Sequence, residues 1–567
     1  MTGPTPVAGQ GAEVARDAQP APLPAVQQRN GIAVPISAIA WGGAAAVFIL
    51  LRLGTVWHAP VAGAEIFGLS GAWQARLGVA DERFVPTLFQ ALSALLLHLS
   101  SSPFPARTCA FLATATVPLA VFLLRGRLGR AGALLALLLL AFDGPAITLG
   151  TSASAMGFDF AITLWLFVVI DRAGAGQPLP RWLFPIVGFG VVTAGPLALP
   201  LVAGWFAARL ARADYPELLA SAWCAVGVVA GLLAATAQFG LGVDGLRVPP
   251  FLLFARGYDQ LWSTASAFDI ALIYATPIVL AGVAAAVIYA NRLYLAHAFR
   301  PRDLVLLAWT AGAFLWLLSS ANAHSAVPVV ALTTPLALLV GPLLAEGIGA
   351  LVVADWRYAR YLLPFAAFAT ALVLSVALKW AHANAVGGTA EQVLVAGLGV
   401  IAVAALGLLA TQRDSRGTLV AAALAVAAVP FLAGGLGVGF SAGGEPAPSP
   451  IITAQAHELR DMALQTAAGG HGSIVVHPSL ADAITWPFRD SGTIVIASRV
   501  PPDAAFVLWP AAQPQPAGYA AVAGEWSLIR QVMPPTTDFL TYLRWLADRG
   551  TVKSTSELIA VYVKAKQ

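Results

Sequence analysis

The sequence predicts an α-helical membrane protein that crosses the bilayer many times and ends in a small α/β domain outside it. Three observations support this: the composition, a series of long apolar runs, and a change of pattern after residue 443. Of the 567 residues, 58% are hydrophobic and 11% are charged, and the mean hydropathy is +0.77. Because about a quarter of the residues in soluble proteins are charged, this composition excludes an ordinary soluble enzyme. A net charge of +4 over so long a chain also excludes a nucleic-acid binder.

The N-terminal segment, residues 1–30, is rich in Pro, Ala, Gln and Gly without apolar periodicity, so we predict a disordered cytoplasmic tail. Residues 31–442 form the predicted transmembrane module. A helix needs about 20 apolar residues to cross the hydrocarbon core, and by this measure the module holds about 13 spans. The predicted spans are 33–55, 107–124, 131–149, 157–171, 181–194, 196–210, 217–240, 267–290, 303–320, 326–345, 361–380, 392–411 and 417–440.

The connection between the first two spans, residues 57–106, is the longest polar segment near the N-terminus, and we predict an outer loop there. Within it, residues 86–100 are apolar but too short to span, so we expect a juxtamembrane helix. Arginines gather in alternate connections, as in Arg125, Arg127 and Arg130 after the second span. Because positively charged loops stay in the cytoplasm, the prediction is a plasma-membrane protein with a cytoplasmic N-terminus and its C-terminal domain outside.

The last part of the chain differs in kind. Residues 443–449 are a Gly- and Pro-rich linker, and residues 450–567 alternate helical and strand patterns, which predicts an extracytoplasmic α/β domain. The expected helices are 451–467 and 537–549, and the expected strands are 473–477, 493–497, 505–508, 526–531 and 558–564.

Familiar catalytic and metal motifs are missing from the sequence. There is no P-loop, HExxH or GxSxG pattern, and the two cysteines, Cys109 and Cys224, lie in apolar runs as buried small residues would. Among the histidines only His471 and His477 are close together, and exposed loop histidines explain them better than a metal site does. No resident cofactor follows from these patterns.

Acidic residues near the outer ends of the spans are the first candidates for function. Glu65 precedes an apolar, helix-like run, although a solvated loop acid fits its position equally well. Asp143 lies near the outer end of the third predicted span, and Asp159 opens the fourth. Because acids at membrane depth are costly, such residues are functional suspects. The short loop 150–156 between them would allow one cavity to hold both.

The other candidates are arginines, a tyrosine and a histidine on the same, outer side of the membrane in the predicted topology. Arg247, Arg256 and Tyr258 lie in the long outer loop 241–266, where they could hold a lipid phosphate or merely meet lipid headgroups. Arg83 belongs to an acidic and basic cluster that could equally be solvated, and His324 lies in a short turn that could simply sit at the interface.

The arrangement resembles the GT-C superfamily of polyprenyl-phosphate-sugar-dependent glycosyltransferases, most of all family 39, the protein O-mannosyltransferase-like group. The resemblance rests on a first helix followed by an outer loop with an acid and a helical run, and then on a juxtamembrane helix. It continues in residues 106–112, 123–129, 141–160, 193–198 and 324–344, and in Trp486-Pro487-Phe488-Arg489-Asp490, similar to a Trp-x-x-Arg-Asp element of some family-39-like outer domains.

The resemblance implies a reaction: transfer of a sugar, a hexose such as mannose, from a polyprenyl-phosphate donor to an acceptor hydroxyl on the outer face. The acceptor could be a protein, a lipid or a glycan. In the family the first-loop acid acts as base or metal contact, and here it falls on Glu65; the acid of the later span falls on Asp159. These two could hold a divalent cation. Arg83, Arg247 and Arg256 would then stabilise the departing lipid phosphate.

Two other classes of protein remain open at this stage. A flippase or transporter of lipid-linked sugars would show broken helices or matching halves, and no half-to-half correspondence is visible in the sequence. A non-catalytic subunit of envelope assembly is the second alternative. It is favoured by Ala64, because relatives often carry a second acid directly before the one at Glu65.

Overall fold

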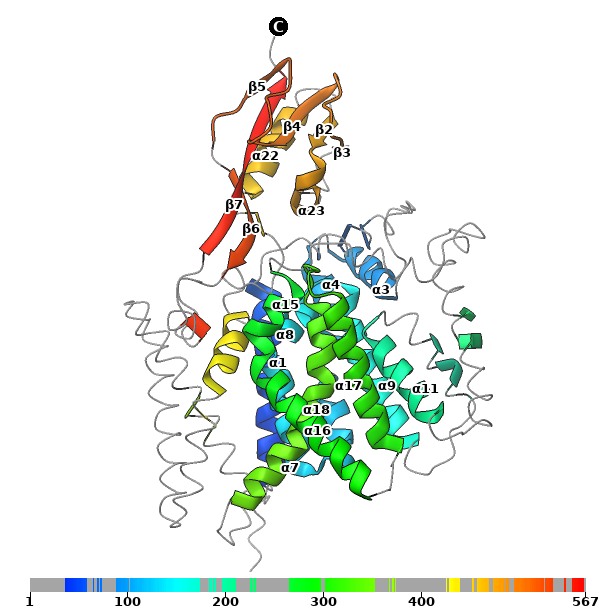
Figure 1. The fold of residues 1–567 in the computed structure, drawn as a ribbon. Coiled ribbons are helices and arrows are strands. Elements are labelled where there is room, and N and C mark those ends of the chain that lie inside the picture. Colours follow the sequence, from blue (N-terminus) through cyan, green and yellow to red (C-terminus); the bar gives the residue numbers. More distant parts are fainter. Residues whose placement is uncertain are drawn as a thin grey trace, which may run out of the picture.

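The computed structural model has two parts, a bundle of helices and a sheet that lies at one end of it (Figure 1). It describes residues 36–58, 88–100, 102–173, 196–210, 265–296, 301–351, 428–438, 451–452, 456–468, 473–484, 486–488, 494–524, 526–533 and 553–564. It also describes short pieces at 65, 69–70, 72–73, 182, 184–186, 188–189, 225–227, 229–230, 367, 370–371, 373, 425 and 545–546.

The bundle is built from apolar helices that follow the predicted spans closely. Among the described residues, four helices are long and apolar enough to cross a membrane, in Ser37–Val56, Phe104–Leu123, Ala267–Arg292 and Val327–Gly349. The helices are α1 (Ile36–His58), α3 (Leu88–Leu97), α4 (Phe104–Thr114), α5 (Val117–Leu123), α6 (Arg125–Leu128), α7 (Arg130–Ala141), α8 (Gly144–Thr151), α9 (Ala155–Ala173), α11 (Ala198–Leu210), α15 (Ala267–Ile270), η2 (Ala271–Ala275), α16 (Thr276–Ala296), α17 (Pro301–Ser319) and α18 (Val327–Leu351).

The predicted number of about 13 spans stays a prediction. The predicted span 392–411 lies outside the described residues, and so does most of 181–194, 217–240 and 361–380. Within the predicted helix 86–100, residues Leu88–Leu97 form α3, which lies at the end of the bundle nearest the sheet (Figure 1). Its juxtamembrane position stays a prediction. The side of the membrane on which each terminus lies also stays a prediction.

One predicted span is wrong in its shape. Residues 131–149 were expected to form a single helix, but the helix ends at Ala141, restarts at Gly144 and bends by 69° between α7 and α8. The cause is local, because Pro145 stands in the first turn of α8. Proline fits a first turn but clashes with the preceding turn inside a helix. Asp143 is therefore the N-cap residue of a second, shorter helix.

Helix α18 lies at the centre of the bundle, since 89% of its apolar stretch is buried, against 33% for α1. It packs closely on α7. A Cβ atom placed on Gly132 of α7 would come within 2.7 Å of the Pro342 Cα of α18. Small residues at such crossings let helix backbones approach in membranes, where packing drives association.

We expect Gly132→Ala to destabilise the protein by about 1–3 kcal/mol, the usual cost of overpacking. The new methyl group would clash with the backbone of Pro342, and this cost outweighs the better helix propensity of alanine. The matched control is Gly347→Ala in α18, where a new Cβ meets nothing within 4 Å; there the propensity gain should make the change neutral or stabilising. Thermal unfolding in detergent measures both variants, and equal midpoints would contradict the proposed close packing.

The C-terminal part contains a seven-stranded sheet of order β1-β6-β7-β4-β2-β3, with β5 paired to β7. Strand β2 is parallel to β3 and β4, and the other pairs are antiparallel. The strands are β1 (Ile451–Ile452), β2 (Ser473–Val476), β3 (Ile494–Ile496), β4 (Ala504–Pro510), β5 (Tyr519–Ala521), β6 (Trp526–Met533) and β7 (Lys553–Lys564); the helices are α22 (Ala456–Ala468), η4 (Pro478–Leu480) and α23 (Ala481–Ile484).

Each of the five predicted strands has a counterpart, and two short strands, β1 and β5, were not predicted. The expected helix 451–467 is wrong in its first turn, where β1 pairs with β6 instead. Helix α22 buries Leu459 and Ala463 in a core shared with Ile474 and Phe506. The predicted helix 537–549 lies outside the described residues, apart from 545–546.

Candidate functional site

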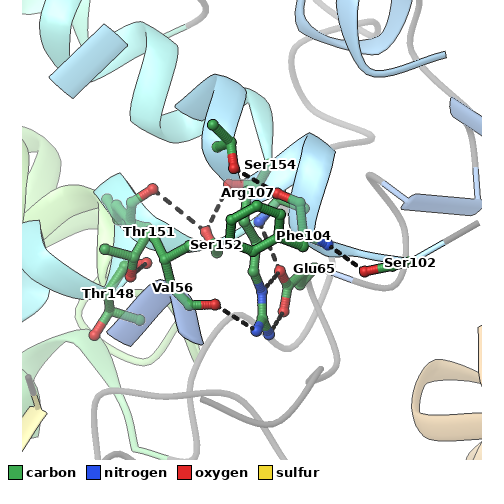
Figure 2. A network of polar contacts seen from close by, with 12 residues as sticks. Val56, Glu65, Ser102, Phe104, Arg107, Thr148, Thr151, Ser152 and Ser154 are labelled. Carbon is green, nitrogen blue, oxygen red and sulfur yellow. Dashed lines mark hydrogen bonds and ion pairs between the residues drawn. The ribbon is translucent and has the colours of Figure 1, made fainter. Parts of the chain in front are cut away.

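Glu65 and Arg107 form a buried ion pair at the end of the bundle that faces the sheet. The Arg107 Nε donates to Glu65 Oε1 at 2.5 Å, and the Arg107 Nη2 donates to Oε2 at 2.6 Å. Figure 2 shows the guanidinium lying edge-on against the carboxylate. The side chains of Arg107 and Glu65 are only 6% and 5% exposed. A two-point pair of this kind fixes orientation as well as charge.

Three further elements hold this pair in place. The backbone N–H of Ala153, in the turn between α8 and α9, donates to Glu65 Oε1 at 2.8 Å. The Arg107 Nη1 donates to the carbonyl of Val56, near the end of α1, at 3.3 Å. Arg107 itself lies in the first turn of α4. Because a buried charge needs a partner and hydrogen bonds, these contacts stabilise the ion pair in the interior of the protein.

Hydroxyl groups line the same region, from the last turn of α8 into the turn after it. Ser152 Oγ and Ser154 Oγ lie 2.9 Å apart, and the Thr151 hydroxyl donates to the Ile147 carbonyl at 2.8 Å (Figure 2). Serine hydroxyls act as donors and acceptors. This edge of the site can therefore hydrogen-bond a polar group.

Asp159 lies in the second turn of α9 and is completely buried. Its Oδ2 accepts from the backbone N–H of Leu197 at 2.9 Å, just before α11. Its Oδ1 has no hydrogen-bond partner among the described residues. A buried carboxylate oxygen without a donor is costly, so the position of this oxygen needs a functional or structural reason.

Asp143 takes part in a separate buried polar group. Its Oδ2 accepts from the Thr333 hydroxyl of α18 at 2.5 Å. The nearby cation is Arg52 of α1, which interacts electrostatically with Asp143 and donates to the Leu140 carbonyl at 3.2 Å. Asp143 and Asp159 therefore bind different partners, and the single cavity expected to hold both carboxylates stays a prediction.

Of the other sequence candidates, the structure describes His324. His324 is half-buried in the turn between α17 and α18. Arg83, Arg247, Arg256 and Tyr258 lie outside the described residues. Sequence reasoning gave no role to Arg107. The available signal was a lone arginine at the start of a long apolar run, where a charge needs a partner.

A divalent cation does not fit the acids in this arrangement. Within the described part of the chain, no group of three or more His, Cys, Asp or Glu side chains could hold a metal ion. Both oxygens of Glu65 face the guanidinium of Arg107, and a second cation there would be repelled. We therefore derive no step through a metal.

The described part of the chain is a helical bundle with a sheet at one end and a buried acid, Glu65, after α1. The chain is similar to the crystal structure of ArnT from Cupriavidus metallidurans bound to undecaprenyl phosphate. The TM-score is 0.51 at 14% sequence identity, and the match covers 92% of this chain and 97% of ArnT. No protein-family model and no curated protein matches the sequence. The likeness shows that the two chains share a fold.

Proposed function

We propose that this protein is a membrane glycosyltransferase that moves a sugar from a polyprenyl-phosphate donor to an acceptor hydroxyl on the outer face. The observation that carries the proposal is the buried Glu65–Arg107 pair within an ArnT-like fold. The ArnT structure is bound to undecaprenyl phosphate, a lipid of the class that would carry the sugar here. A multi-pass bundle suits such a donor, because the isoprenoid stays in the bilayer while its head group reaches the site.

The proposed base is Glu65. A carboxylate offers about four acceptor positions, and the described donors to Glu65 are two groups of Arg107 and the Ala153 N–H. Its Oε2 thus keeps one position for an acceptor hydroxyl. In the reaction the hydroxyl oxygen attacks the anomeric carbon, the bond from that carbon to the phosphate oxygen breaks, and the phosphate leaves with the electron pair. The hydroxyl proton passes to the carboxylate.

Arg107 and Asp159 have supporting roles in this proposal. Arg107 would stabilise the negative charge that develops on the departing lipid phosphate, as positioned cations do. The free Oδ1 of Asp159 orients the acceptor by accepting from one of its hydroxyls. We further propose that the sugar is a hexose such as mannose, as the family-39 resemblance implies. Arg83, Arg247, Arg256, Tyr258 and His324 remain proposed contacts of the lipid phosphate.

The test is a transfer assay with purified protein in lipid nanodiscs, using undecaprenyl-phosphate mannose and undecaprenyl-phosphate glucose with lipid, glycan and peptide acceptors. Sugar transfer from either donor supports the proposal. Movement of the intact donor between leaflets of liposomes, without transfer, would instead identify a flippase. Tight donor binding with neither activity would identify a non-catalytic subunit.

Asp159→Asn is expected to lower turnover at least tenfold, because the amide replaces a buried acceptor oxygen by a donor group and misorients the acceptor hydroxyl. The matched control is Asp171→Asn, at the other end of the same helix, where the carboxylate pairs with Arg127 at 2.7 Å. It removes a carboxylate from α9 far from the site and should leave turnover nearly unchanged. Equal turnover of the two variants would contradict the role of Asp159.

A further inference from the structure

Trp486 connects the C-terminal part to the segment that follows Glu65. It lies just after α23 and is 2% exposed. Its ring packs edge-to-face on Trp73, with centroids 6.1 Å apart and an angle of 89° between the planes. Such aromatic pairs contribute beyond the area that they bury. The two residues come from opposite parts of the chain, so this contact joins the sheet to the helical bundle.

The buried cluster around Trp486 contains residues near Glu65, next to Arg107 and in the turn that binds Glu65. Leu69 and Ala72 follow Glu65, and Ala106 directly precedes Arg107. Ala153 supplies the backbone N–H that Glu65 accepts. The full cluster is Leu69, Ala72, Ala94, Leu97, Ala106, Ala110, Ala153 and Trp486.

Trp486 has the largest side chain in this cluster, whose other buried members are two leucines and five alanines. Alanines cannot fill the space that a tryptophan leaves, so removing the indole would open a cavity behind the Glu65 segment. Such a cavity costs stability and lets the surrounding elements shift. Among the described members of the cluster, Trp486 is also the one that the C-terminal part supplies.

We propose that Trp486 is a positioning residue: the C-terminal part of the chain, through Trp486, holds the Glu65 segment against α4 and the turn at Ala153. The consequence for turnover rests on the proposed function, but the positioning itself does not. A displacement of about 1 Å can cost 10²-fold in rate even when the change is made away from the reacting atoms. The C-terminal sheet thus takes part in the site without contacting the Glu65 carboxylate.

The first experiment measures positioning without any assay of transfer. In a background where Cys109 and Cys224 are replaced by alanine, Ala72→Cys reports on the cluster, since Ala72 is fully buried. Its maleimide labelling should be slow, and Trp486→Leu should accelerate it at least tenfold. Leu99→Cys, at a position that is 82% exposed, should label equally fast in both backgrounds.

Two further variants distinguish loss of positioning from general unfolding of the protein. Trp73→Leu removes the same ring contact from the bundle side and should also accelerate labelling of Ala72→Cys, with the sheet untouched. Trp526→Leu makes the same substitution inside the core of the sheet, where Trp526 packs with Leu528. It should leave the labelling rate unchanged. Unchanged labelling in both Trp486→Leu and Trp73→Leu would overturn the proposal.

The second experiment measures turnover in the nanodisc assay. Trp486→Leu should lower kcat at least tenfold with a KM for the lipid donor that changes less than threefold, and Trp486→Phe should restore most of the rate because it retains a ring. Trp526→Leu should retain kcat. Equal losses of kcat in Trp486→Leu and Trp526→Leu would indicate general destabilisation of the sheet and contradict positioning. If no transfer is found for the wild type, the labelling result still decides the structural claim.

Discussion

Glu65→Gln is expected to reduce sugar transfer by about 10²–10⁴-fold, the usual contribution of a general base. The same substitution should also destabilise the protein by about 3–5 kcal/mol, because it leaves a buried guanidinium without its counter-charge. Both effects follow from the two hydrogen bonds that join Arg107 to the Glu65 carboxylate. Turnover in nanodiscs and thermal unfolding in detergent measure them separately.

The two effects can be separated by neutralising both partners. The double variant Glu65→Gln with Arg107→Gln contains no unpaired charge, so most of the lost stability should return. If Glu65 is the base, turnover should stay at or below the level of the single variant, because the double variant also lacks the proposed phosphate contact of Arg107. Recovery of transfer in the double variant would mean that the ion pair is structural and that the base lies elsewhere, with Asp159 as the next candidate.

The sequence was sufficient to find Glu65 but not its partner. An acid before an apolar run is visible without a structure, and the family resemblance pointed to the same residue. The ion pair joins residues 42 positions apart, and an arginine at the start of a span is usually explained by the membrane interface. Only the packing of α4 beside Glu65 shows that the Arg107 side chain turns inward.

The break between α7 and α8 was predictable in part. The sequence Asp143-Gly144-Pro145 contains the N-cap residue and the proline of a new helix. Hydropathy averaged over a whole span conceals such a break, since apolar residues continue on both sides. The contact of Trp486 with Trp73 was not predictable, because nothing in either local sequence specifies a partner more than four hundred positions away. Tertiary packing alone determines it.

Arg52 shows most clearly that the sequence alone does not reveal the partners of a buried residue. It stands within the first predicted span and received no role from the sequence, although a charge inside a span needs an explanation. In the structure it is completely buried, with its guanidinium 3.5 Å from the centre of the Phe48 ring. Its hydrogen bond to the Leu140 carbonyl lies at the C-terminal end of α7, where a cation complements the helix dipole. Asp143 places a negative charge at the N-terminus of α8, where a negative charge complements the helix dipole.

Arg52→Met should therefore destabilise the protein by about 3–5 kcal/mol, because Asp143 becomes a buried carboxylate without a cation nearby. Adding Asp143→Asn should recover much of this loss. The matched control is Arg292→Met, whose ion pair with Glu346 is about half exposed, at 53% and 55%; exposed pairs contribute at most about 1 kcal/mol. Thermal unfolding in detergent compares the three variants.

The outcome of this comparison bears on the site itself, because α8 leads directly into the turn whose Ala153 N–H binds Glu65. If Arg52→Met also lowers turnover and Asp143→Asn restores both stability and rate, the charges at the helix break act by fixing the direction of α8. If Arg52→Met unfolds at the same temperature as Arg292→Met, the Arg52–Asp143 interaction does not stabilise the break. The hydrogen bond from Thr333 to Asp143 would then be the contact that holds α8 to α18.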